Sequence, residues 1–102
     1  MEIKYKNTSG TLTLYMYGEL DECSASKVKN AVDRLFLDTT DVQKVIFDLS
    51  GVTFMDSTGI GLLIGRYKKF KSFNVPSYIT GATLPTEKVI LLAGLYQIMP
   101  KY

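Results

Sequence analysis

Hydrophobic and polar residues alternate along the first part of the chain. Residues 3–6 form a short alternating run, and residues 11–17 place two sets of side chains on opposite faces, Leu12, Leu14 and Met16 against Thr13, Tyr15 and Tyr17. A period of two predicts half-buried strands. Residues 7–10 between the runs are typical of a turn. The sequence therefore predicts an N-terminal β-hairpin, which residues 18–21 bring to an end.

Two later segments have the spacing of amphipathic helices. The first follows Ser24, a candidate N-cap for which Asp21 is the alternative, and its apolar stripe is Ala25, Val28, Ala31, Val32, Leu35 and Phe36. The second begins near Ser57 or Thr58, with an inner stripe of Ile60, Leu63, Ile64, Tyr67 and Phe70. Its basic residues are expected to face water, and these are Arg66, Lys68, Lys69 and Lys71.

A third helix and two more strands complete the pattern. Pro85 and Glu87 suit the first turn of a helix that ends at Ala93, with Gly94 as its C-cap. Residues 44–49 are apolar on both faces except at Asp48, which predicts a central strand. Residues 75–80 predict a strand at the sheet edge, because Pro76 cannot donate to a ladder. Ile98 and Met99 are candidates for a short final strand.

This order of elements predicts an α/β fold. Strands and helices alternate after the hairpin, which favours a mixed sheet of four to five strands with three or more helices packed on it. The chain has 102 residues, the size of one domain spanning 1–102, and 46% of them are hydrophobic. We therefore expect a packed core that needs no metal or disulfide.

Composition excludes several classes of function. The net charge of +2 is too small to favour nucleic-acid binding, and no apolar run approaches the ~20 residues of a membrane span. The single cysteine, Cys23, fits a reducing cytoplasm. The absence of histidine excludes a Ser-His-Asp or Cys-His catalytic set and disfavours zinc, so we expect no catalytic residues, cofactor or metal.

The candidate chemistry lies in residues 54–61, Phe-Met-Asp-Ser-Thr-Gly-Ile-Gly. Ser57 and Thr58 are predicted at a helix N-terminus, where backbone N–H groups favour a phosphate or another anion. Simpler interpretations are that Ser57 is only an N-cap and that Asp56 only caps or forms a salt bridge. Gly59 and Gly61 would allow close approach of a partner, while the Gly61 and Gly65 pair favours close packing of the helix on the sheet.

Four segments together resemble a known family, namely residues 18–21 (Gly-Glu-Leu-Asp), 45–49, 54–61 and 93–95 (Ala-Gly-Leu). They resemble the bacterial STAS domain and, more closely, the anti-sigma factor antagonists. Residues 63–68 strengthen the similarity to the sporulation type, which acts on the anti-sigma F factor. The resemblance covers residues 3 to about 99.

The resemblance implies a switch and not an enzyme. In that family the unphosphorylated antagonist binds an anti-sigma factor that is also a serine kinase, and this binding frees the sigma factor. The kinase then phosphorylates the serine that corresponds to Ser57, and a serine phosphatase removes the phosphate. We expect the partner to contact residues around this serine, namely Glu19, Asp21, Asp56, Ser57, Thr58, Gly59, Ile60 and Gly61.

Two departures from the family pattern carry expectations of their own. Thr58 stands where a second serine is frequent, so it is the alternative phosphate acceptor. Relatives usually continue into a further C-terminal helix where this chain ends at Tyr102, which predicts exposed apolar surface near Ile98 and Met99. We expect a monomer or a weak dimer. Two other functions stay open, a STAS scaffold that is never phosphorylated and a nucleotide-binding module, although the chain lacks a P-loop.

Overall fold

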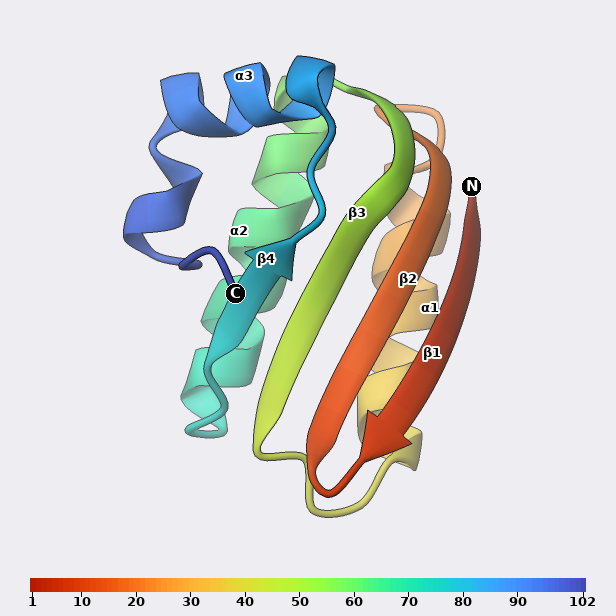
Figure 1. The fold of residues 1–102 in the computed structure, drawn as a ribbon. Coiled ribbons are helices and arrows are strands. Elements are labelled where there is room, and N and C mark those ends of the chain that lie inside the picture. Colours follow the sequence, from red (N-terminus) through yellow and green to blue (C-terminus); the bar gives the residue numbers. More distant parts are fainter.

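The computed structural model describes residues 1–102 as a mixed four-stranded sheet with helices packed on it (Figure 1). The strands are β1 (Glu2–Thr8), β2 (Thr11–Leu20), β3 (Lys44–Met55) and β4 (Ser77–Thr80). The helices are α1 (Ala25–Asp38), α2 (Ser57–Ser72), α3 (Leu84–Ala93) and the short 3-10 helix η1 (Leu95–Gln97). The predicted α/β class, the hairpin and the three helices are confirmed.

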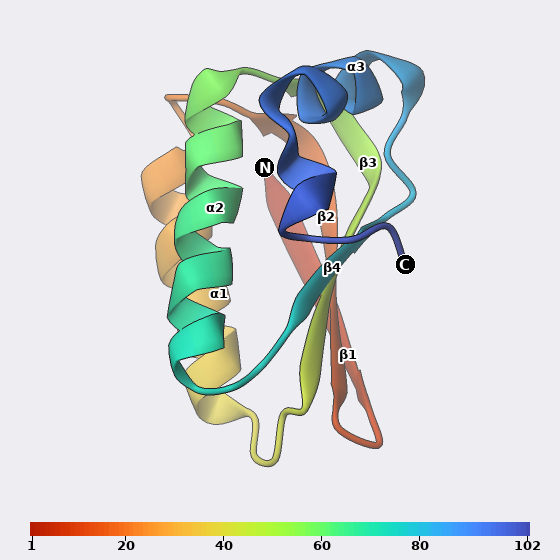
Figure 2. The same cartoon turned by 90° about the vertical axis from the view of Figure 1, so that its left-hand side faces the viewer.

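The strands lie in the order β1-β2-β3-β4. Strand β1 is antiparallel to β2, whereas β2, β3 and β4 are parallel to one another. The predicted central position of β3 and the edge position of β4 are therefore confirmed, and β4 begins just after Pro76. Helices α1 and α2 lie on one side of the sheet, and α3 crosses its upper end (Figure 2). Because β2 and β3 run parallel, their carboxyl ends meet at that upper end.

One hydrophobic core joins the sheet to α1 and α2. The inward residues of β2 are those predicted from the alternation, Leu12, Leu14 and Met16, and all are fully buried. Phe70 of α2 contacts Phe36 of α1 and Phe47 of β3, with ring centroids 4.5 and 6.2 Å apart. In α2 the predicted stripe is buried at Ile60, Leu63 and Phe70 but only partly buried at Ile64 and Tyr67.

Strands β2 and β3 are both longer than predicted. Strand β3 continues six residues past Leu49 to Met55, and β2 continues through Gly18 to Leu20. The register between them shifts at Tyr15/Tyr17 and again at Gly18/Glu19, where Gly18 has φ of 110°. Such irregularities break the period of two that marks a strand in sequence. Gly18 therefore bends β2 and does not end it.

The prediction that all the basic residues of α2 face water is wrong. Arg66 is only 8% exposed and forms an ion pair with Asp33 of α1. Lys69 reaches the other oxygen of the same carboxylate at 3.3 Å. Lys68 and Lys71 are exposed, as predicted. The pairing of Asp33 with two cations holds α1 against α2, and a buried charge of this kind is tolerated only with its partner.

The end of the chain also differs from the prediction. Met99 is fully buried and Ile98 partly buried, so neither forms the exposed apolar surface expected there. In place of a regular fifth strand, residues 100–102 pair with the edge of β4. The Ile79 N–H donates to the Pro100 carbonyl at 3.0 Å, and the Tyr102 N–H donates to the Ile79 carbonyl at 2.8 Å.

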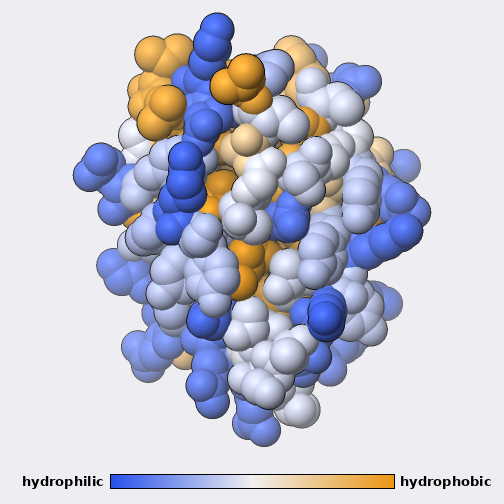
Figure 3. All heavy atoms as spheres, in the orientation of Figure 1, coloured by the Kyte–Doolittle hydropathy of each residue, from blue (hydrophilic) through white to orange (hydrophobic).

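Helix α3 begins and ends as predicted, but its outer face is apolar. Pro85 lies in the first turn, and Gly94 has φ of 69° at the C-cap. Figure 3 shows hydrophobic residues gathered at the upper end of the molecule, over α3. Large exposed apolar side chains of this helix are Leu84, Leu91 and Leu92.

A cluster of polar side chains fixes α3 to the end of the chain. Tyr96 Oη donates to Glu87 Oε1 at 2.9 Å, and Lys101 Nζ lies 2.7 Å from the same oxygen. The hydrogen bonds from Lys101 and Tyr96 lower the pKa of Glu87. Burial and the bond to Glu87 raise the pKa of Tyr96 to about 12.

We expect the stabilisation from Glu87 to be pH-dependent. The folded pKa of Glu87 lies below its ordinary value of 4.5, so its contribution is present above that pH and is lost as the pH falls through the folded pKa. Glu87→Gln should lower the melting temperature at pH 7, and the gap from wild type should close in acid. Thermal melts at pH 7 and pH 3.5 test this. An undiminished gap at the lower pH would contradict the ion-pair account.

Candidate functional site at the start of helix α2

A single residue, Asp56, connects β3 to α2. Its backbone is extended, and its Oδ1 accepts a hydrogen bond from the Gly59 N–H at 3.1 Å. Its carbonyl accepts the first helical bond, from the Ile60 N–H at 3.1 Å. These contacts make Asp56 the N-cap of α2. The simpler interpretation of Ser57 as the N-cap is therefore wrong, while a capping role for Asp56 is present.

Ser57 and Thr58 are the first two residues of α2, and both are exposed. Neither hydroxyl takes part in a side-chain hydrogen bond of the structure. The backbone N–H groups of a first helical turn have no partners within the helix, and the helix dipole is positive there. A phosphate on either hydroxyl would thus lie in solvent, beside groups that favour negative charge.

Gly59 is needed for packing and is not available to a partner. A Cβ at this position would lie 2.4 Å from the Leu20 carbonyl oxygen and 2.9 Å from Met55 Cγ. The absence of a side chain therefore lets α2 start directly against the end of β2. The expectation that a partner approaches the backbone at Gly59 is wrong.

Gly61 and Gly65, in contrast to Gly59, have open space where a side chain would lie. A Cβ at either position would have nothing within 4 Å, so the prediction that these glycines pack α2 on the sheet is wrong. Gly61 is exposed one turn beyond Ser57. Ile60, expected to contact the partner, is only 7% exposed and packs in the core. The open surface of this turn therefore consists of Ser57, Thr58 and Gly61.

The register of β2 against β3 brings Glu19 to this surface. Glu19 lies opposite Phe54 and Leu20 opposite Met55, and the Asp56 N–H donates to the Leu20 carbonyl at 3.4 Å. Glu19 is exposed. The turn after β2 therefore lies beside the start of α2.

Asp21 and Ser24 shape the turn that presents Glu19. The Asp21 carboxylate accepts hydrogen bonds from the N–H groups of Cys23 and Ser24, at 3.0 and 3.1 Å. Ser24 Oγ donates to the Glu19 carbonyl at 2.8 Å. Ser24 is the N-cap residue of α1, as predicted, although its side chain makes no cap bond. Asp21 is partly buried and already has backbone partners.

Sequence reasoning missed Phe54 as a surface residue. This ring is 50% exposed on β3, next to Glu19 and two residues before Asp56. The signal was present as a large apolar residue in the segment between the predicted strand and helix, but that segment reads as a loop in the sequence. An exposed aromatic beside polar groups is typical of the centre of a protein–protein interface.

The comparison with protein-family models decides the family. The model described as "STAS domain" matches residues 2–102. This chain belongs to the STAS domain family. Two relatives match nearly the whole domain. The "Anti-sigma F factor antagonist" of Paenibacillus polymyxa is 26% identical over 102 residues, 100% of this chain and 86% of its own. The "Anti-sigma-B factor antagonist" of Listeria monocytogenes is 28% identical, over 97% of this chain and 84% of its own.

A solved structure gives the same fold for this STAS domain. The Bacillus cell fate determinant SpoIIAA, in its phosphorylated form, superposes with a TM-score of 0.72 at 22% identity, covering 99% of this chain and 91% of that one. The two sequence relatives are named for the regulator that they antagonise and not for a reaction. The domain thus groups with non-enzymatic regulatory proteins.

Groups that could hold a metal or act as a base beside Ser57 are few in the STAS domain. No group of three or more histidine, cysteine or acidic residues is placed to hold a metal. The Asp56 carboxylate, the acidic group next to Ser57 in sequence, uses its Oδ1 in the cap bond to Gly59, and the chain has no histidine. None of the helices combines the length and apolar character of a membrane span.

Proposed function

We propose that this STAS domain is an anti-sigma factor antagonist controlled by phosphorylation of Ser57. The unphosphorylated form binds an anti-sigma factor with serine kinase activity and releases the sigma factor, and phosphate on Ser57 prevents this binding. The observation that carries the proposal is the exposed, unbonded Ser57 hydroxyl in the first turn of α2, at the end of the sheet where Glu19 lies opposite Phe54.

The position of Ser57 explains how a phosphate can switch binding without unfolding the domain. Phosphorylation adds about 1.5 to 2 negative charges and three acceptor oxygens. The start of α2 tolerates this charge, because the dipole and the free N–H groups favour it. A partner that buries Ser57 must remove water from the dianion beside Asp56 and Glu19. An unpaired buried charge costs several kcal/mol. Phosphorylation should therefore lower the affinity for the partner without lowering the stability of the domain.

The names of the relatives support the class of partner. Both antagonise an anti-sigma factor, one of the F type and one of the B type. The solved structure of SpoIIAA in a phosphorylated form supports a phosphorylation switch in this fold. We place this chain with the sporulation antagonists, on the segments that carry the resemblance, and in the cytoplasm. A serine phosphatase would restore the binding form, and Thr58 is the alternative acceptor.

A release assay tests the function. The unphosphorylated domain is added to a preformed complex of sigma factor and anti-sigma kinase from the same genome, and the products are separated by gel filtration. We expect free sigma factor and a new complex that contains the domain. The pre-phosphorylated domain is the control and should leave the original complex intact. If the unphosphorylated domain also leaves the complex of sigma factor and kinase intact, the result contradicts the proposal and supports the alternative of a scaffold domain.

The exposed leucines of α3 are expected to extend the partner surface. Helix α3 and the start of α2 lie at the same end of the molecule (Figures 1 and 2). Leu92→Ser should weaken partner binding by about tenfold with little change in melting temperature, because Leu92 is 91% exposed and contributes little to the core. The matched control is Leu37→Ser, a 68% exposed leucine at the far end of α1. Partner affinities are measured by calorimetry. Equal affinities for the two variants would show that α3 does not contact the partner.

A further inference from the structure

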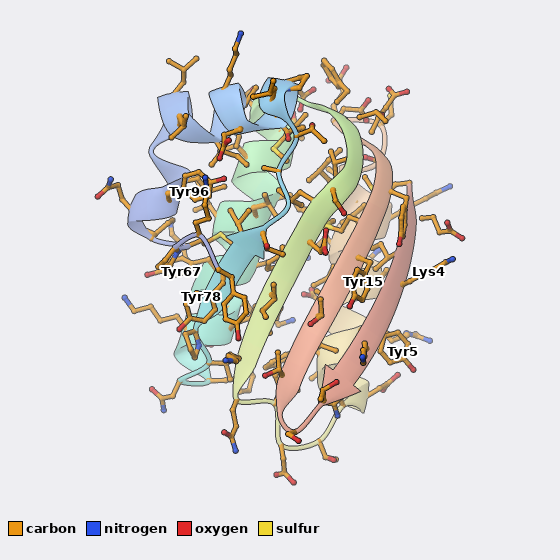
Figure 4. All side chains as sticks on the ribbon, in the orientation of Figure 1. Lys4, Tyr5, Tyr15, Tyr67, Tyr78 and Tyr96 are labelled. Atoms are coloured by element: carbon orange, nitrogen blue, oxygen red, sulfur yellow. The ribbon has the colours of Figure 1, made fainter.

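A concave surface lies near the carboxyl end of α2, far along the helix from Ser57. This cavity has a volume of about 420 Å³. Its walls come from three segments of the chain: the last turns of α2, residues 74–78, which lead into β4, and the chain after η1. Figure 4 shows Tyr67 of α2 and Tyr78 of β4 close to each other at this edge, far from Tyr15 on the sheet.

The lining of the cavity includes a buried hydroxyl without a partner. Ser77 is only 2% exposed, and its Oγ makes no hydrogen bond. The fold satisfies most buried polar groups, and one that stays unpaired is unfavourable. Elsewhere in this domain the buried Thr86 hydroxyl bonds to Thr83. Ser77 therefore lacks within the fold the partner that a bound ligand atom can supply.

The charge of the lining points to an anion. Lys71 is the one charged side chain among the nine residues around the cavity, and no carboxylate lines it. Its Nζ lies 5.7 Å from the centre of the Tyr67 ring. Asn74 and the two tyrosines add neutral hydrogen-bonding groups. The remaining walls are apolar, including Ile98 and Pro100. This combination of one cation, a few polar groups and apolar walls is typical of small-molecule sites.

We propose that this cavity binds a small organic anion, with a carboxylate or phosphate group on an apolar body. Lys71 pairs with the charge, the Tyr67 ring and Ile98 contact the body, and the Ser77 hydroxyl gains a hydrogen-bond partner. The site does not depend on the antagonist function, because it shares no residue with the Ser57 surface. Substitution of Ser57 should leave it unchanged.

Amide chemical shifts of the whole chain test the proposal with three probes, benzoate, phenyl phosphate and inorganic phosphate. We expect saturable shifts at residues 74–79 and 97–101 with at least one of the organic probes, and at least fivefold weaker binding of inorganic phosphate. Lys71→Gln should weaken binding at least fivefold. Lys68→Gln is the matched control, since Lys68 is exposed on the same helix outside the cavity.

Ser77→Ala separates the ligand site from a purely structural serine. We expect the folded domain, checked by its amide spectrum, to bind the organic anion more weakly than wild type. The proposal is overturned if none of the probes gives saturable shifts at these residues. It is also overturned if the Lys71 and Lys68 variants bind equally well, or if inorganic phosphate binds as tightly as the organic probes.

Discussion

Replacing Ser57 with aspartate is expected to weaken binding of the anti-sigma partner by about a hundredfold or more, which corresponds to ~3 kcal/mol. The hydroxyl is exposed in the unbound domain, so a carboxylate there meets no clash, and the start of α2 favours its charge. The penalty arises only when a partner removes water from the new charge beside Asp56. Titration calorimetry gives the affinity, and thermal melting should give an unchanged midpoint.

Two further variants isolate the charge from the change in shape. Ser57→Ala should bind the partner as well as wild type does, because alanine adds neither bulk nor charge at this exposed position. Ser57→Asn has nearly the volume of aspartate without its charge and should lose far less affinity. If asparagine and aspartate weaken binding equally, the size of the side chain and not its charge controls the switch.

Gly59→Ala is expected to destabilise the domain by about 1–3 kcal/mol, a large effect for one methyl group. The added carbon would lie 2.4 Å from the Leu20 carbonyl oxygen, which belongs to the backbone of β2 and cannot rotate away. Relief requires the start of α2 to move off the sheet, which also displaces Asp56 and Ser57. Denaturant unfolding measures the loss, and partner affinity should fall as well.

Gly61→Ala is the matched control two residues along the same helix. Nothing lies within 4 Å of its Cβ position, and alanine favours a helix over glycine by about 1 kcal/mol. We expect this variant to unfold at equal or higher denaturant concentration. Similar stabilities for the two variants would mean that α2 does not contact β2 at Gly59 as described.

Local patterns were sufficient to predict much of this fold. The alternation of Leu12, Leu14 and Met16 depends only on strand geometry, and the ends of α3 depend on Pro85 and Gly94 at neighbouring positions. Each of these signals lies within the element that it defines. The order of elements then restricted the architecture to a mixed sheet with helices on it, as found.

The predictions that failed depend on contacts between distant residues. Arg66 is buried because Asp33 lies across from it on α1, 33 positions away. Gly59 packs and Gly61 does not because the Leu20 carbonyl lies under only one of them. The extension of β3 to Met55 depends on register shifts against β2 that no local pattern carries. Residue types alone gave no means of separating these cases.

The location of the candidate site could be predicted from the sequence, whereas the roles of its individual residues could not. The segment 54–61 and the neighbouring Glu19 were found from their sequence and the resemblance, and the register brings them together. The separate roles of its residues needed the structure. Asp56 caps α2, Gly59 and Ile60 pack inward, and Phe54 faces out.

Intact-mass analysis with phosphosite mapping tests the central claim most directly. The domain is incubated with the anti-sigma kinase of its own genome and ATP, alongside the Ser57→Ala and Thr58→Ala variants. The account predicts one added phosphate on Ser57 in wild type and in Thr58→Ala, and none in Ser57→Ala. Phosphate that persists in Ser57→Ala, or a domain that binds the kinase but gains no phosphate, would contradict it.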